Sequence, residues 1–271
     1  MNLKTSWKKV LAGSLAILAM ASFAAGCGSS SSSETIKKDT IVVGTNPTYK
    51  PFEFTTDDNK GYDGFDMDLI KAVAKHMNKQ VEIKNIAFDA LIPALKTKDI
   101  DIISSGMTIT QPRSEAVTFS MPYAQSAQAI VFKASTPVKT LADLNGKTIS
   151  AQMGSTGADD ANKIQGATVK TFDNGSDALL DLYNGGAQAT VIDMSVAQYY
   201  KTQHPEANLA YIQYPGDNAG YLGLAVSKDN KALADEVNKA LKEMKANGEL
   251  DQIYQKWFGE KAPDMPEEVK F

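Results

Sequence analysis

The sequence predicts an α/β protein of two similar lobes, and two observations support that prediction. Short β-branched strands alternate with amphipathic helices along most of the chain, which is the pattern of an α/β architecture. Two segments also echo one another, "KTKDIDIISSGM" and "YNGGAQATVIDM", each running from a helix end into a strand that ends in polar residues. Ligands of open α/β sheets bind at the carboxyl ends of strands, so two such units can face each other across a ligand.

The first set of elements begins at residue 40. "TIVVGT" (Thr40–Thr45) is typical of a buried parallel strand. The stretch "DMDLIKAVAKHM" has Ile70, Val73, Ala74 and Met77 at helical spacing, which predicts a helix with one face inward. "VEIKNI" and "IDIISS" are strand-like, and "DALIPALKTKD" predicts a short helix whose proline lies in the first turn.

The second set continues the alternation. Strands are predicted at "AIVFK", "KTISAQ", "ATVKTF" and "ATVIDM", with helical stretches between them. Near the end, "ADEVNKALKEMKANG" places Leu233, Val237, Leu241 and Met244 on one face of a long helix that stops at Asn-Gly.

Composition narrows the function. Of 271 residues, 43% are hydrophobic and 22% are charged, which is ordinary for a globular protein. The net charge is −4 and no basic cluster stands out beyond the first ten residues, so we expect no nucleic-acid partner. With two histidines and one cysteine, neither a zinc site nor an internal disulfide is expected, and no cofactor is implied.

Residues 1–26 are predicted to be a lipoprotein signal peptide. Lys4, Lys8 and Lys9 form a positive start, and Val10–Ala25 is an apolar stretch too short for a comfortable membrane span. It ends in "AAGC", which resembles a bacterial lipobox, in which the cysteine, Cys27, is lipidated. The alternative is an ordinary signal peptide with a chance cysteine.

The segment 27–39 is predicted to be a tether. It contains "GSSSSS", a flexible polar tract, and its root-mean-square reach is roughly 18 Å. We therefore expect an exported domain anchored to the outer face of the cell membrane, on the periplasmic side if the host has an outer membrane.

Polar residues at the predicted strand ends suit a zwitterion between the lobes. Arg113 offers planar bidentate donors to a carboxylate. Asp193 ends a strand and can accept from an ammonium, together with the Gly106 carbonyl and the Thr108 hydroxyl. The turn "QMGSTGADDAN" lies between a strand and a predicted helix, and its amides, notably that of Thr156, can reach a carboxylate.

Three further residues would surround the ligand's side chain. Tyr49 and Phe88 offer flat rings that can clamp an aliphatic stem, and Asn46 ends the first strand. Taken singly, each candidate has an ordinary structural role, such as a surface arginine, a helix-capping aspartate or a core aromatic. The constellation as a whole favours ligand binding.

Four segments resemble the polar amino acid-binding proteins of ABC importers, of the glutamine and the lysine/arginine/ornithine types. They are "VVGTNPTYKPFEF", "GYDGFDMDLIKAVAKHM", "FDALIPALKTKDIDIISSGMTITQPRSEAVTFSMPY" and "NGELDQIYQKWFG". The resemblance covers residues 40–260 and implies the two-lobe periplasmic-binding-protein fold with a cleft between lobes. It implies crossover strands near Tyr123–Ala127 and Asn218–Leu222, a first lobe of residues 40–124 plus 221–271, and a second lobe of residues 125–220.

The resemblance also implies the site. Arg113 would bind the α-carboxylate with the backbone amides of Thr108 and Thr156, and Asp193 would bind the α-ammonium. The implied ligand-binding residues are Asn46, Tyr49, Phe88, Ser105, Gly106, Thr108, Arg113, Gln152, Thr156 and Asp193.

Two residues bear on which side chain the ligand carries. Relatives commonly carry aspartate where this chain has Asn46, and Gln152 replaces a lysine or an aliphatic residue. A cationic side chain would lack a counter-charge there, which favours glutamine over arginine or lysine. The alternative of a basic amino acid stays open if Glu53, Asp66 or Asp89 lies near the pocket.

The expected role is to bind a polar L-amino acid and deliver it to an ABC permease by hinge closure. We expect a monomer that is not an enzyme. A dehydratase on the same fold is the remote alternative, and it would need a general acid beyond Asp193, which the ammonium occupies. A sensor domain is the other rival, and it would need a membrane span or a signalling module.

Overall fold

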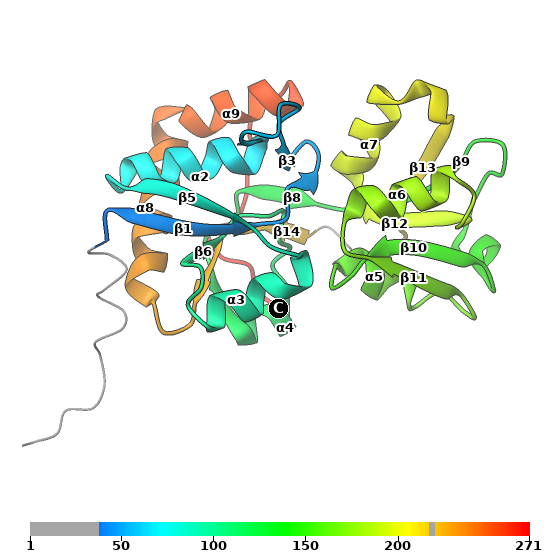
Figure 1. Cartoon of the computed structure of the whole chain (residues 1–271), viewed down its shortest axis with the longest axis horizontal. Coiled ribbons are helices and arrows are strands. Elements are labelled where there is room, and N and C mark those ends of the chain that lie inside the picture. Colours follow the sequence, from blue (N-terminus) through cyan, green and yellow to red (C-terminus); the bar gives the residue numbers. More distant parts are fainter. Residues whose placement is uncertain (1–37, 217–219) are drawn as a thin grey trace, which may run out of the picture.

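Each of the two lobes is built on a five-stranded sheet (Figure 1). The computed structural model describes residues 38–216 and 220–271. The predicted signal peptide, Cys27 and most of the predicted tether lie outside the described residues. Within the described part, no helix is long and apolar enough to cross a membrane.

The first lobe has helices on both faces of its sheet. Its strands are, in spatial order, β5 (Gln80–Asn85), β1 (Thr40–Thr45), β6 (Ile102–Ile103), β15 (Ala225–Ser227) and β7 (Val117–Phe119). Its helices are α2 (Phe65–His76), the 3₁₀ turn η1 (Phe88–Ala90), α3 (Leu91–Lys96), α4 (Gln111–Ala116), α8 (Lys231–Asn247) and α9 (Glu249–Phe258). A small sheet joins β2 (Thr48–Tyr49), β3 (Glu53–Thr55) and β4 (Tyr62–Asp63).

The second lobe is continuous in sequence. Its strands are, in spatial order, β11 (Thr168–Phe172), β10 (Thr148–Gln152), β12 (Ala189–Asp193), β9 (Gln128–Lys133) and β13 (Leu209–Gln213). Its helices are the 3₁₀ turn η2 (Leu141–Leu144), α5 (Thr156–Ala161), α6 (Gly175–Tyr183), α7 (Met194–Gln203) and the 3₁₀ turn η3 (Pro205–Ala207).

Two strands connect the lobes. β8 (Ala124–Ser126) leads from the first lobe into the second, and β14 (Gly220–Leu222) leads back. They pair antiparallel, Gly220 opposite Ser126, between the two sheets (Figure 1). Both strands lie within the segments where the crossovers are expected, although residues 217–219 are outside the described part. A two-stranded connection of this kind leaves the lobes free to rotate about it.

Aromatic packing fixes α2 and α9 beside the start of β8. The ring of Phe65, the first residue of α2, contacts the rings of Tyr123, Tyr254 and Phe258 at 5.0–5.9 Å between centroids. The Tyr254 hydroxyl also donates to the carbonyl of Tyr123, at 2.9 Å. Each fully buried ring of this size contributes on the order of 1.5–3 kcal/mol to folding, so this end of the first lobe is a firm base for the connection.

Candidate ligand-binding site between the lobes

The carboxyl ends of four strands converge between the lobes. In the first lobe, β1 is followed by Asn46, and β6 is followed by the turn that contains Gly106. In the second lobe, β10 ends at Gln152 and β12 ends at Asp193. In both lobes these strands run parallel, so their polar ends collect at one edge of each sheet, and the two edges face each other.

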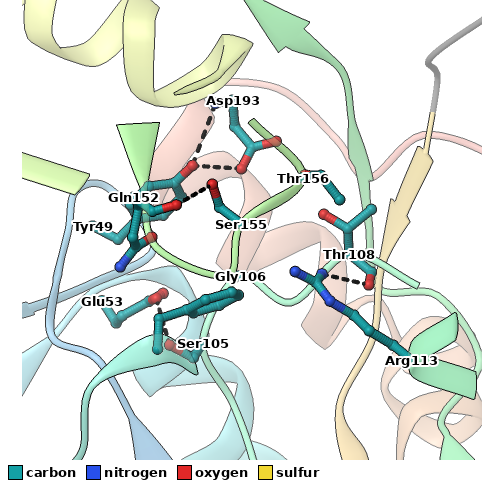
Figure 2. A pocket seen from close by; sticks show the side chains of 11 residues that line it. Tyr49, Glu53, Ser105, Gly106, Thr108, Arg113, Gln152, Ser155, Thr156 and Asp193 are labelled. Atoms are coloured by element: carbon teal, nitrogen blue, oxygen red, sulfur yellow. Dashed lines mark hydrogen bonds between the residues drawn. The ribbon is translucent and has the colours of Figure 1, made fainter. Parts of the chain in front are cut away.

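A pocket lies between these edges (Figure 2). Nine of the ten predicted site residues line it, and Asn46 lies behind Gln152, which donates to it. Glu53 and Ser155 also line it and were not among the predicted site residues. The lining residues are Tyr49, Glu53, Phe88, Ser105, Gly106, Thr108, Arg113, Gln152, Ser155, Thr156 and Asp193. They leave a cavity of about 10 Å³, close to what one water molecule needs, so the lobes must part to admit an amino acid.

Arg113 projects from the first lobe toward the second. It lies in the first turn of α4, which Thr110 caps by accepting from the Arg113 amide at 3.4 Å. Its guanidinium donates to the carbonyl of Thr108 and to that of Gly154, in the second lobe, both at 2.9 Å. The Phe88 ring lies under it, 5.3 Å from the guanidinium carbon. The fork therefore reaches the second lobe, as a carboxylate clamp requires.

The carboxylate of Asp193 is held by three donors. The Tyr49 hydroxyl donates to Oδ2 at 2.6 Å from the first lobe, and Ser126 and Gln128 donate to Oδ1 at 2.6 and 2.8 Å. Burial raises the pKa of Asp193, while these hydrogen bonds and the Arg113 charge lower it. Each donor favours the ionised form, which is the form that accepts an ammonium.

The backbone at position 106 requires glycine. Its φ is +50°, which lies in the left-handed region, and a Cβ there would meet the Tyr49 ring at 3.4 Å. The Gly106 amide donates to Oδ2 of Asp66 at 2.8 Å. The turn is therefore fixed from below by α2.

Glu53 places a second carboxylate in the pocket wall. Its side chain is 1% exposed, and Oε1 accepts from Ser105 Oγ at 2.9 Å. Within the described residues, Oε2 has no hydrogen-bond partner. Burial, followed by the nearby Asp66 charge, raises the pKa of Glu53 well above its usual value. The sequence carries one sign of this buried acid, because Glu53 stands among the apolar residues of "PFEF".

The two amides at the far end of the pocket are bonded to each other. Gln152 Nε2 donates to Asn46 Oδ1 at 2.9 Å and to the carbonyl of Asp173 at 3.1 Å. Asn46 Nδ2 donates to Asn174 Oδ1 at 3.2 Å. Asn46 belongs to the first lobe and the other three residues to the second, so the two bonds that Asn46 makes, to Gln152 and to Asn174, cross the cleft.

Of the other two acids considered, Asp66 lies below Gly106, and Asp89 packs against Gly154 at the cleft. Neither lines the pocket. In the described part of the chain, no cluster of three or more histidine, cysteine, aspartate or glutamate side chains could hold a metal ion.

Comparison with known proteins identifies the family to which this fold belongs. The family model for bacterial extracellular solute-binding proteins, family 3, matches residues 41–260. The arginine-binding extracellular protein ArtP of Bacillus subtilis is 36% identical over 87% of this chain and 92% of its own. The glutamine-binding protein GlnH of the same organism is 32% identical over 93% and 98%. A solved ancestral arginine-binding protein bound to arginine is 43% identical, with a TM-score of 0.78 over 82% of this chain and 99% of its own.

Proposed function

Because the chain belongs to family 3 of the bacterial extracellular solute-binding proteins and is an amino acid-binding protein of ABC transport, its ligand is an amino acid, and we propose that this is an L-amino acid with a cationic side chain, arginine above all. The observation that carries this proposal is the carboxylate of Glu53 in the pocket wall. The expectation of glutamine depended on the lack of a counter-charge. Burial favours the neutral form of Glu53, and a guanidinium beside it would favour the ionised form, which would then be the counter-charge.

The bonding at the far end of the pocket supports the same choice. Oε2 of Glu53 has no partner within the described residues, and Glu53 lines the pocket, so Oε2 could accept from a donor that enters it. The amides of Asn46 and Gln152 are engaged with each other and with the second lobe. A guanidinium supplies donors only, and it would offset the cost of burying a carboxylate.

The rest of the pocket would bind the α-amino-acid group. Arg113 would exchange its bonds to the carbonyls of Thr108 and Gly154 for a bidentate pair with the α-carboxylate. Thr156, the first residue of α5, would add its amide. Asp193 would accept from the α-ammonium, and the rings of Tyr49 and Phe88 would flank the side chain.

Such a ligand would favour closure because it contacts both lobes only when they are together. Arg113 belongs to the first lobe and Asp193 to the second, so the two ends of one amino acid join them. We propose that the closed, loaded form is what the ABC permease receives. We also propose export with anchoring through Cys27, which the sequence of the N-terminus supports.

Glutamine is the second candidate, since Asn46 and Gln152 are side-chain amides and could exchange their mutual bond for bonds to a third amide. GlnH, the glutamine-binding relative, covers nearly the whole chain. The two candidates differ in charge: an arginine side chain needs the carboxylate of Glu53 as a counter-charge, whereas a glutamine side chain does not.

Calorimetry with arginine, lysine and glutamine on the wild type and on Glu53→Gln separates them. We expect the wild type to prefer arginine over glutamine, and Glu53→Gln to lose at least tenfold in arginine affinity while keeping glutamine affinity. Glu82→Gln, at an exposed position of β5, is the matched control and should behave like the wild type. A wild type that prefers glutamine, with a preference that Glu53→Gln leaves unchanged, would overturn the cationic ligand but not amino-acid binding.

A further inference from the structure

Gln128 occupies an unusual position behind the pocket. It is the first residue of β9 and lies directly opposite Asp193 in the antiparallel pair with β12. Its side chain is 5% exposed, and it does not line the pocket. The next four residues of β9, Ala129 to Phe132, are buried and apolar. A buried amide at the head of such a strand therefore needs a reason beyond packing.

The amide of Gln128 joins two site residues. Nε2 donates to Oδ1 of Asp193 at 2.8 Å and to Oγ1 of Thr156 at 3.1 Å. The orientation of the amide is fixed, because an ionised carboxylate can only accept and so must face the NH₂ group. Gln128 Oε1 is then left without a hydrogen-bond partner within the described residues.

The surrounding backbone leaves little freedom for this arrangement. A Cβ on Gly157 would lie 2.5 Å from the carbonyl oxygen of Val191 and 3.1 Å from Gln128 Oε1. Gly157 is the second residue of α5 and Val191 lies in β12. The first turn of α5 therefore packs closely against β12. The Gln128 amide lies between Thr156, which begins α5, and Asp193, which ends β12.

We propose that Gln128 is a positioning residue that holds Asp193 and Thr156 at a fixed separation, so that the second lobe recognises the ammonium and the carboxylate of the ligand as one unit. This inference rests on the proposed function, which assigns those two groups to Asp193 and Thr156. When the binding groups are already oriented, less conformational entropy is lost on binding. Holding Asp193 and Thr156 in place therefore strengthens the binding of a ligand that carries both an ammonium and a carboxylate.

Ser126 adds a link to the lobe connection. It is the last residue of β8 and donates to the same Oδ1 at 2.6 Å. Two donors on Oδ1 and the Tyr49 hydroxyl on Oδ2 fix the plane of the Asp193 carboxylate. Ser126 contacts Asp193 but not Thr156, so its removal should affect the ammonium end alone.

The test is a ligand-truncation series measured by calorimetry. L-arginine carries both groups, agmatine lacks the carboxylate, and δ-guanidinovalerate lacks the ammonium; if glutamine proves the tighter ligand, γ-aminobutyramide and glutaramic acid replace them. Gln128→Met keeps the side-chain volume and removes the donors. We expect at least tenfold weaker arginine binding in Gln128→Met. Agmatine should weaken only several-fold, because Asp193 loses one donor, and δ-guanidinovalerate should lose less than threefold. Gln125→Met, on the exposed face of β8, is the matched control and should match the wild type.

Ser126→Ala provides a second variant that keeps the proposal testable if Gln128→Met does not fold. It should weaken arginine and agmatine several-fold and leave δ-guanidinovalerate unchanged. An equal loss for all three ligands in Gln128→Met, or no loss for any, would overturn the positioning role, as would a Ser126→Ala variant that treats all three ligands alike. A folded wild type that binds no amino acid would instead overturn the proposed function on which the inference rests.

Discussion

Replacing Asp66 with asparagine should change how stability depends on pH. Asp66 is fully buried at the start of α2, and its Oδ2 accepts from the Gly106 amide and the Tyr123 hydroxyl, both at 2.8 Å. Asparagine can keep both bonds through its carbonyl oxygen and carries no charge. Within the described residues, Asp66 Oδ1 has no partner that would be lost.

The size of the effect follows from the carboxyl group's pKa. Burial raises the pKa of Asp66 from 3.8 to about 7, against the opposing hydrogen bonds from Gly106, Tyr123 and Ser104. The neutral acid therefore stabilises the fold at low pH, and this contribution is lost as pH rises through about 7. The full loss is about 4 kcal/mol, at about 1.4 kcal/mol per pH unit, of which about 3 kcal/mol falls between pH 5 and 8.

Urea unfolding of the wild type and Asp66→Asn at pH 5 and pH 8 measures this contribution. We expect the wild type to lose about 3 kcal/mol more than the variant over this range. Asp58→Asn is the control, because Asp58 is exposed and its pKa is lowered by the Thr56 hydroxyl, so it is ionised in both states above pH 5. Equal losses in the wild type and Asp66→Asn would refute the argument that a buried, titrating Asp66 shapes the stability.

Three further changes test the site and the fold. Arg113→Ala should abolish amino-acid binding by calorimetry with the thermal midpoint nearly unchanged, and Arg113→Lys should recover little, since the ammonium lacks the planar fork; parent-like binding by either variant would place the clamp elsewhere. Tyr49→Phe removes the 2.6 Å hydrogen bond to Asp193 across the cleft and should weaken ligand binding by about 1.5–3 kcal/mol, whereas unchanged affinity would show that this bond adds nothing to the closed state. Hydrogen bonding to Glu249 raises the pKa of His76 above 6.5, so the stability that His76 contributes is complete below pH 6.5 and is lost as pH rises through the raised pKa. Between pH 6 and 9, His76→Gln should therefore lose less stability to urea than the wild type does, and an equal loss would contradict this.

Periodicity predicted the elements well where one local pattern decides burial. The helix face of Leu233, Val237, Leu241 and Met244 is confirmed, since all four are buried in α8. The helix predicted through Met77 ends at His76, and Met77 is its C-cap. Asn78 then takes a φ of +54°, which ends the helix. Such endings depend on a single backbone conformation that hydrophobic spacing does not encode.

The site was predictable where residues end strands, and less so where the chain folds back. Asp193 and Gln152 follow the rule for strand ends. Glu53 enters the pocket only because β3 folds under the turn at Ser105, 52 positions away. Ser126 and Gln128 contact Asp193 across 67 and 65 positions. Gln128 does so through the pairing of β9 with β12, and Ser126 lies at the end of β8, placements that no local pattern specifies. The glutamine hypothesis depended on Asn46 and Gln152 and left open whether Glu53 lies near the pocket. The position of Glu53 in the pocket wall is the basis for proposing a cationic ligand instead.

The placement of β15 sets an order in which the two lobes can be completed as the chain is made and exported. β15 (Ala225–Ser227) pairs with both β6 and β7, and α9 supplies the Tyr254 that bonds to Tyr123, so the first lobe needs the last strand and the last helix. The second lobe needs nothing beyond β13 for its sheet. A chain that is made from its N-terminus can therefore fold its second lobe first, while β6 and β7 still lack β15, the strand that pairs with both of them. Truncation at residue 220 should leave a folded, soluble second lobe attached to an unfolded segment of the first lobe, which a protease would remove.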